Sequence, residues 1–108
     1  MANIYKVLGQ LSPAATTVST LYTVPASTQA VCSTLTICNR GASTTIRLAV
    51  RPAGVTLSNE HYLIYDAYVN ANDTLFFTLG ITLATTDVVS VYAGSANVSF
   101  GLYGTEIA

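Results

Sequence analysis

Charged side chains are scarce in this sequence. Its 108 residues include four Lys or Arg and five Asp or Glu, which leaves a net charge of −1. Charged residues make up 8% of the chain, against about 25% in a typical soluble domain. Nucleic-acid binding by counterion release needs a basic surface and is therefore excluded. The neutral exterior is either covered by other proteins or is simply a hydroxyl-rich surface, and the low charge of interface cores favours the first interpretation.

Residue types that carry catalysis or bind metals are equally few. The chain has one histidine and no tryptophan. His61 and Asp66 are separated by an odd number of positions, so on one regular strand they point to opposite faces and cannot form a dyad. A single histidine and two cysteines without CxxC spacing do not supply a metal site. We therefore expect no catalytic, cofactor-binding or metal-binding residues.

The two cysteines, Cys32 and Cys38, fall within one predicted strand. Strict alternation places both on the same face, about 20 Å apart, whereas bridged Cα atoms lie within about 7 Å of each other. A disulfide between them is excluded on this geometry. Free thiols are expected, and a bond between chains is the remaining alternative.

Long apolar segments are absent as well. No uninterrupted apolar run approaches the length of a membrane span, and the start, MANIYKVLGQLSPAA, lacks the continuous apolar core of a signal peptide. We expect neither membrane insertion nor secretion.

What is present throughout is alternation of apolar and small polar residues in short runs that end at Gly, Pro, Asn or Asp. The predicted strands are 3–11, 20–24, 29–39, 44–51, 61–69, 73–79, 87–93 and 97–106. This pattern predicts an all-β fold, an antiparallel β-sandwich of seven to eight strands that is immunoglobulin-like or jelly-roll-like. Residues 1–19 are expected to form an N-terminal strand or an arm, and residues 20–108 a single sandwich domain.

Alternation also assigns side chains to faces. The residues expected to point inward are Val31, Leu35, Ile37, Ile46, Leu48, Val50, Leu75, Phe77, Leu79, Val98, Phe100 and Leu102. Arg47, Arg51, Phe76 and Tyr103 are expected to point outward.

The segment EHYLIYDAYV, residues 60–69, is apolar on both predicted faces. His61, Leu63, Tyr65, Ala67 and Val69 fall on one side, and Tyr62, Ile64, Asp66 and Tyr68 on the other. Tyrosine suits an interface because its ring is apolar and its hydroxyl can hydrogen-bond. The alternative is an edge strand whose outer tyrosines only cover neighbouring strands. We interpret Tyr62, Tyr65, Tyr68, Phe76, Arg47 and Arg51 as candidate interface residues; the arginines serve either solubility or docking of acidic side chains.

Several segments together carry a resemblance to a known class of proteins. In TTDVVSVYAGSANVSFGLYGTEIA, an Asp and alternating valines before Tyr92 resemble the corner that enters the penultimate strand of immunoglobulin-like sandwiches. With TLYTVPASTQAVCSTLTICNRG, IRLAVRPAG and NDTLFFTLGITL, residues 20–106 resemble small β-sandwich structural proteins of tailed-phage virions. The tryptophan and the disulfide of antibody domains are missing, so kinship with antibodies is not implied.

The resemblance implies a non-enzymatic virion protein, assembled in the host cytoplasm and located in the virion. A capsid decoration (cement) protein that binds between capsomers is the first expectation; a tail, baseplate or fibre component is the alternative within this class. The implied partners are the major capsid protein or other virion proteins and further copies of the chain itself, as a trimer. A small carbohydrate- or receptor-binding module, using exposed Tyr62, Tyr68 or Phe76, is the alternative from a different class.

Overall fold

The computed structural model describes residues 2–108, and Met1 lies outside the described part. The strands are β1 (Asn3–Leu11), β2 (Ser19–Thr23), β3 (Gln29–Asn39), β4 (Thr44–Arg51), β5 (Tyr62–Val69), β6 (Thr74–Leu83), β7 (Val88–Ala93) and β8 (Val98–Ile107). Two 3-10 turns, η1 (Pro52–Gly54) and η2 (Asn59–His61), lie between β4 and β5. The predicted antiparallel β-sandwich is confirmed; the largest difference in range is β6, which continues four residues past its predicted end at 79.

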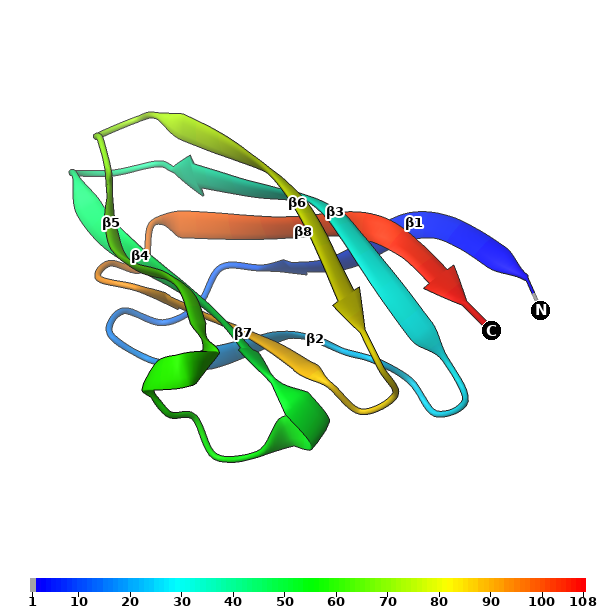
Figure 1. Cartoon of the computed structure of the whole chain (residues 1–108). Coiled ribbons are helices and arrows are strands. Elements are labelled where there is room, and N and C mark those ends of the chain that lie inside the picture. Colours follow the sequence, from blue (N-terminus) through cyan, green and yellow to red (C-terminus); the bar gives the residue numbers. More distant parts are fainter. Residues whose placement is uncertain (1) are drawn as a thin grey trace.

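The strands pair as a long hairpin that has been rolled up. β1 pairs with β8, β2 with β7, β3 with β6 and β4 with β5, all antiparallel. The roll produces two layers, with strand orders β1-β8-β3-β6 and β2-β7-β4-β5 (Figure 1). Of the two topologies expected, this order is the jelly roll, since an immunoglobulin sandwich places sequential strands A and B side by side.

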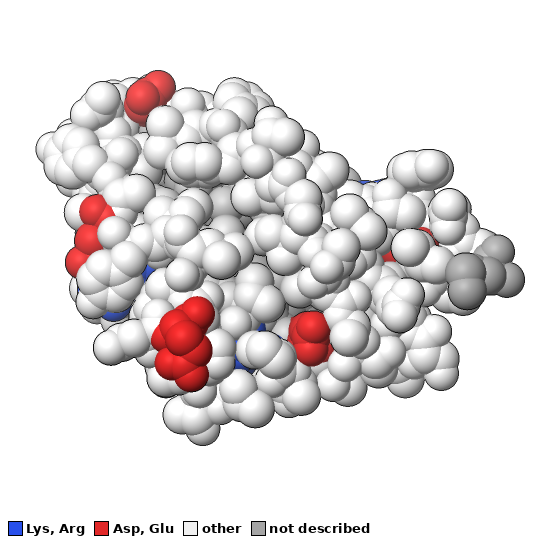
Figure 2. Space-filling model, viewed as in Figure 1, with Lys and Arg blue, Asp and Glu red and all other residues white. Residues whose placement is uncertain are grey.

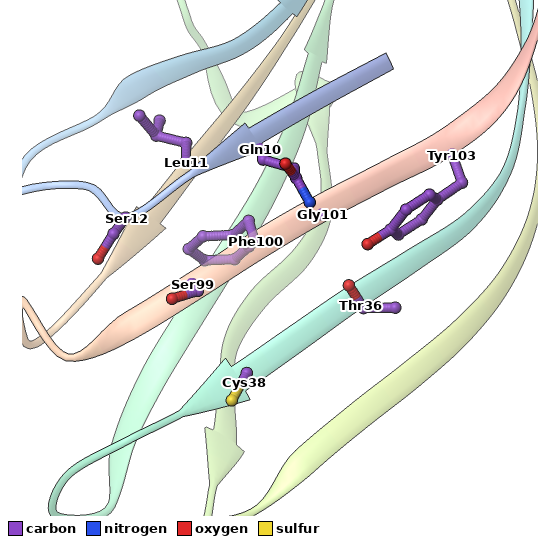
Figure 3. A pocket seen from close by; sticks show the side chains of 9 residues that line it. All are labelled: Gln10, Leu11, Ser12, Thr36, Cys38, Ser99, Phe100, Gly101 and Tyr103. Atoms are coloured by element: carbon purple, nitrogen blue, oxygen red, sulfur yellow. The ribbon is translucent and has the colours of Figure 1, made fainter. Parts of the chain in front are cut away.

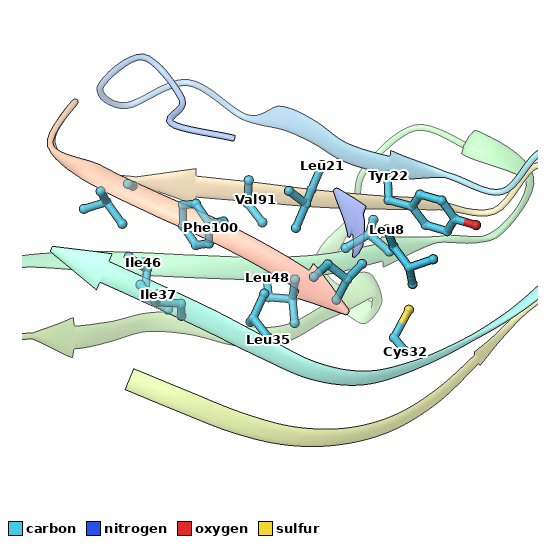
Figure 4. Packing of buried hydrophobic residues seen from close by; sticks show 14 of the residues in the cluster. Leu8, Leu21, Tyr22, Cys32, Leu35, Ile37, Ile46, Leu48, Val91 and Phe100 are labelled. Atoms are coloured by element: carbon cyan, nitrogen blue, oxygen red, sulfur yellow. The ribbon is translucent and has the colours of Figure 1, made fainter. Parts of the chain in front are cut away.

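The core fills the space between the two sheets (Figure 4). Leu35 and Ile37 of β3, Ile46 of β4 and Val98 of β8 are fully buried. Phe100 supplies the aromatic ring of this cluster. The inward positions predicted for β4, β6 and β8 are confirmed, as are the outward positions of Arg47 and Phe76.

The face assignment of β3 is wrong at its start. Cys32 is fully buried in the core, whereas Val31 is only partly buried. The register between β3 and its neighbours shifts between Cys32 and Thr34, so that Ser33 is an extra residue opposite β8. Such a bulge reverses the alternation before it. Cys32 and Cys38 therefore lie on opposite faces of the sheet, and the prediction that they share one face is incorrect.

The alternation predicted for β5 is also wrong, because this strand contains two irregularities. Its register against β4 shifts twice, between Ile46 and Leu48 and between Leu48 and Ala49. At the first shift Asp66 adopts a positive φ of 53°, which Asp tolerates better than most residues. The inward residues are Ile64, Ala67 and Val69. Tyr62, Tyr65 and Tyr68, which the sequence divided between two faces, consequently lie together on the outer face of the β2-β7-β4-β5 sheet.

The N-terminal segment contributes an edge strand. Residues 3–11 pair with β8 along their length, with a register shift between Val7 and Gly9. At this end the chain termini run together: the amide of Ala2 donates to the carbonyl oxygen of Ala108 at 2.7 Å, and the amide of Ala108 donates back at 3.0 Å (Figure 1).

The burial of two leucines predicts that replacing each by alanine will change the stability of the protein by very different amounts. Leu35 is 0% exposed and Leu63 is 54% exposed. We expect Leu35→Ala to lower the free energy of unfolding by about 2 to 5 kcal/mol, because it removes buried methyl groups and leaves a cavity. Leu63→Ala, the matched control, should change it by no more than about 0.5 kcal/mol. Urea unfolding followed by circular dichroism measures both, and equal losses in the two variants would contradict this assignment.

Candidate functional site

The most exposed of the candidate interface residues are aromatic. Tyr65, Tyr68 and Phe76 are 59%, 65% and 73% exposed, whereas Tyr62 is partly buried. Phe76 pairs with Thr36 on the outer face of the other sheet. The fold therefore gathers the three tyrosines and Arg47 on one sheet face but places Phe76 on the opposite side of the sandwich.

Arg47 is held within the molecule by Asp66 and by two aromatic rings. Its Nε and Nη2 donate to the two carboxylate oxygens of Asp66 at 2.6 and 3.3 Å. The guanidinium carbon lies 4.3 Å from the ring centroids of both Tyr65 and Tyr92, in cation–π geometry. The hydrogen bond to Asp66 is the main reason that the pKa of Arg47 is raised. This arginine is a fixed part of the surface rather than a free cation.

Arg51, farther along β4, fastens the turn that follows it. Its Nε donates to the hydroxyl of Ser90 at 3.1 Å, and its Nη1 donates to the carbonyl oxygens of Gly54 and Val55. Asp87 holds the same turn from the other side, because its carboxylate accepts the amide of Ala53. The two candidate arginines thus have intramolecular partners in this structure.

The same is true of most other charged groups. Glu106 accepts hydrogen bonds from Lys6 at 3.4 Å and from the buried hydroxyl of Tyr22 at 2.6 Å. Arg40 donates to Ser99 and Ser12. Glu60 is the most solvent-exposed of the charged groups in ion pairs, with a side chain that is 76% exposed. In the view of Figure 2 the acidic groups form several separated patches, basic atoms are visible only in small areas, and most of the surface is uncharged.

The four strands of the β1-β8-β3-β6 sheet contain few charged residues. Lys6 and Glu106 are the only charged residues in its four strands, and they pair with each other near the chain ends. A hollow of about 410 Å³ lies on the outer face of this sheet (Figure 3). Its lining residues are Gln10, Leu11, Ser12, Thr36, Cys38, Ser99, Phe100, Gly101 and Tyr103.

Gly101 lines this hollow at a position that has no room for a side chain. A Cβ there would lie 2.7 Å from the hydroxyl oxygens of both Thr36 and Tyr103. Hydroxyl, amide and thiol groups line the space, so it can donate and accept hydrogen bonds but offers no carboxylate or imidazole. The guanidinium of Arg40 donates to the hydroxyls of Ser12 and Ser99 in this lining, so a cation borders the hollow.

A second hollow, of about 510 Å³, lies beside the tyrosines of β5. It is lined by Asn59, Tyr62 and Tyr65. The two tyrosine rings meet edge to face, with centroids 4.9 Å apart and planes at 82°. Two aromatic rings with an adjacent amide are a combination that can bind a small polar molecule.

His61 sits at the end of η2, close to this second hollow. Its Nδ1 accepts the backbone amide of Ser58 at 3.0 Å, and its Nε2 is 4.0 Å from Glu60. Among residues 2–108 no group of three or more His, Cys, Asp or Glu side chains could hold a metal ion. None of the helices in that range is long and apolar enough to cross a membrane.

Comparison of the chain with models of protein families, with curated proteins and with solved structures found no match.

The burial of the cysteines predicts which thiol reacts. Cys32 is 0% exposed, and burial raises the pKa of its thiol to about 11, so the reactive thiolate is scarce at neutral pH. Cys38 lines the first hollow and is partly exposed. We expect a disulfide reagent such as DTNB to modify one thiol in the native protein and two after unfolding. Cys38→Ser should abolish the native reaction, and Cys32→Ser should retain it; rapid reaction of native Cys38→Ser would contradict the placement of Cys32.

Proposed function

We propose that this chain is a non-enzymatic structural protein of a phage virion, a decoration protein that stabilises the head by binding between capsomers. One observation carries the proposal: most charged side chains have hydrogen-bond partners within the chain, while Tyr65 and Tyr68 on one face and Phe76 on the other remain exposed. Covering the tyrosine face removes aromatic rings from water, and the ion pair beside Tyr65, between Arg47 and Asp66, is already formed within the chain. Interface cores have this composition, with tyrosine and phenylalanine enriched and charge depleted.

The fold is compatible with this role. Jelly rolls are the architecture of many viral capsid domains, although they also form lectins, and fold alone does not decide function. The resemblance of residues 20–106 to small sandwich proteins of tailed phages favours the virion among these uses. A tail, baseplate or fibre position remains the alternative within the same class.

A decoration protein acts by mass action. A protein that binds the assembled shell but not its dissociated subunits raises the free energy needed to open the shell. Repetition over the lattice multiplies modest contacts. The chain needs only a rigid core and a surface that loses little when it is covered, and both are present here.

Binding to assembled particles tests the proposal. Labelled protein should bind mature heads of the phage that encodes it and should not bind unassembled shell subunits. Its binding to the heads should depend little on salt, because few charges are available for screening. Tyr68→Ala should weaken binding by more than about tenfold, the usual cost of losing an aromatic anchor. Tyr5→Ala, which removes another exposed tyrosine from the opposite sheet, is the matched control.

Negative-stain images of particles that carry the labelled protein show whether it lies on the head or on the tail. Label over the head supports decoration, and label confined to the tail supports the alternative component. Absence of label from purified particles, together with no binding to added heads, would remove the virion role.

The second hollow favours one further candidate, a carbohydrate-binding module. Sugars stack on aromatic rings and hydrogen-bond to amides, and Tyr62, Tyr65 and Asn59 provide both groups. If this is the function, a glycan array should show selective binding that Tyr65→Ala weakens at least about tenfold, while Tyr5→Ala leaves it unchanged. An array without selective binding would contradict this candidate and leave the virion role untouched.

A further inference from the structure

The four edge strands of the sandwich differ in how well they are protected against pairing with another chain. Natural sheets block their edges with charges, prolines, bulges or short strands. β1 carries Lys6 and a register shift, β2 has five residues and a shift, and β5 has two shifts and Asp66. These three edges are poor templates for an additional strand.

β6 is the least protected of the four edges, because its single register shift is accompanied by neither a charge nor a short length. It is ten residues long, TLFFTLGITL, with no charged residue and no proline. It lies at the end of the β1-β8-β3-β6 sheet, where only β3 pairs with it (Figure 1). Its inward and outward side chains alternate without interruption from Thr74 to Leu83. Its one register shift, like those of the other three edges, lies against its only neighbour, where Leu79 and Gly80 are opposite Ser33 of β3.

The core is also incomplete beside β6. Its inward side chains Leu75, Phe77, Leu79 and Ile81 are only partly buried, whereas Leu35 and Ile37 of the adjacent β3 are 0% exposed. The other side of the sandwich is closed, since Leu8, Leu21 and Tyr22 of β1 and β2 are all buried. An apolar row and the least protected strand edge thus occur at the same place.

We propose that β6 pairs antiparallel with β6 of a second copy of this chain, about a two-fold axis at Thr78. Residues directly opposite in an antiparallel pair point to the same face of the sheet. This register places Phe77 opposite the partner copy's Leu79 and Leu75 opposite its Ile81, so the two inner rows continue each other. On the outer face Thr74 meets Thr82, and Thr78 meets its own copy.

Gly80 selects this register. A Cβ at Gly80 would meet no atom within 4 Å, so the outer surface above it is open. In the proposed pair the ring of Phe76, 73% exposed in the single chain, covers the Gly80 of the second copy. An aromatic side chain across from a strand glycine is a stabilising cross-strand arrangement. Shifting the pair by two residues in either direction would place Phe76 opposite a threonine, Thr82 or Thr78, and would leave only a threonine opposite Gly80.

The features of β6 point to an identical copy as the occupant. A two-fold pair presents the same segment to itself, and the segment has no charge that would oppose a like charge. The pair closes with two copies, so it gives a dimer in place of the trimer that the sequence resemblance implied. The pairing belongs to the free protein and does not depend on the virion role.

A charge exchange at the axis tests the pairing. Sedimentation equilibrium should show wild-type dimers, while Thr78→Lys and Thr78→Glu should each raise the dimer dissociation constant at least about a hundredfold, because each places like charges opposite one another. An equal mixture of the two variants should dimerise again, since Lys then faces Glu. Thr20→Lys, at an exposed threonine on the β2 edge, is the matched control and should remain dimeric.

Circular dichroism of each variant confirms that the fold is intact, which is expected because Thr78 is exposed and outward-facing. A wild-type protein that stays monomeric at millimolar concentration, dimers that persist in Thr78→Lys, or folded variants whose mixture stays monomeric would each overturn the proposal. None of these outcomes bears on particle binding, so failure of the pairing and failure of the virion role can be told apart.

Discussion

Burial of one apolar face of each sheet against the other is the interaction on which this molecule depends. A rolled-up hairpin pairs the backbone of its strands except along the sheet edges, but either sheet alone would leave its apolar face in water. Leu35 and Ile37 from one sheet and Ile46 and Leu48 from the other belong to one buried cluster. Since this cluster constrains only alternate positions, the outward positions are free to carry threonine, serine and tyrosine.

Strand positions could be predicted from the sequence because they depend on local alternation and on turn residues. The bulges could not, because a bulge adds a residue without a distinctive composition. Ser33 has an ordinary side chain for a strand, yet it reverses the face of Cys32. Asp66 offered the better signal, since an Asp between apolar residues tolerates the positive φ that a bulge requires.

The exposure of single residues in the candidate site could be predicted from the sequence, but their arrangement in space could not. Outward exposure of Phe76 follows from alternation within one strand, and the structure agrees. The grouping of Tyr62, Tyr65 and Tyr68 depends on the bulges of β5, and the fork between Arg47 and Asp66 depends on the register between two strands. Pairing register depends on residues far apart in the sequence. The pairing of charged side chains with partners in the same chain therefore became visible only in the three-dimensional structure.

The two open sides of the sandwich differ: one is closed by hydrogen bonds, and the other leaves apolar side chains partly exposed. On the β1–β2 side, Tyr22, Glu106 and Lys6 close the structure with hydrogen bonds, whereas the β5–β6 side leaves apolar groups partly exposed. Pairing through β6 would use backbone groups and the inner row of side chains. It would leave Tyr65 and Tyr68 of both copies uncovered, because these lie on the outer face of the other sheet. A dimer of this kind would carry two identical aromatic surfaces, and two linked contacts that engage at once bind more tightly than either contact alone.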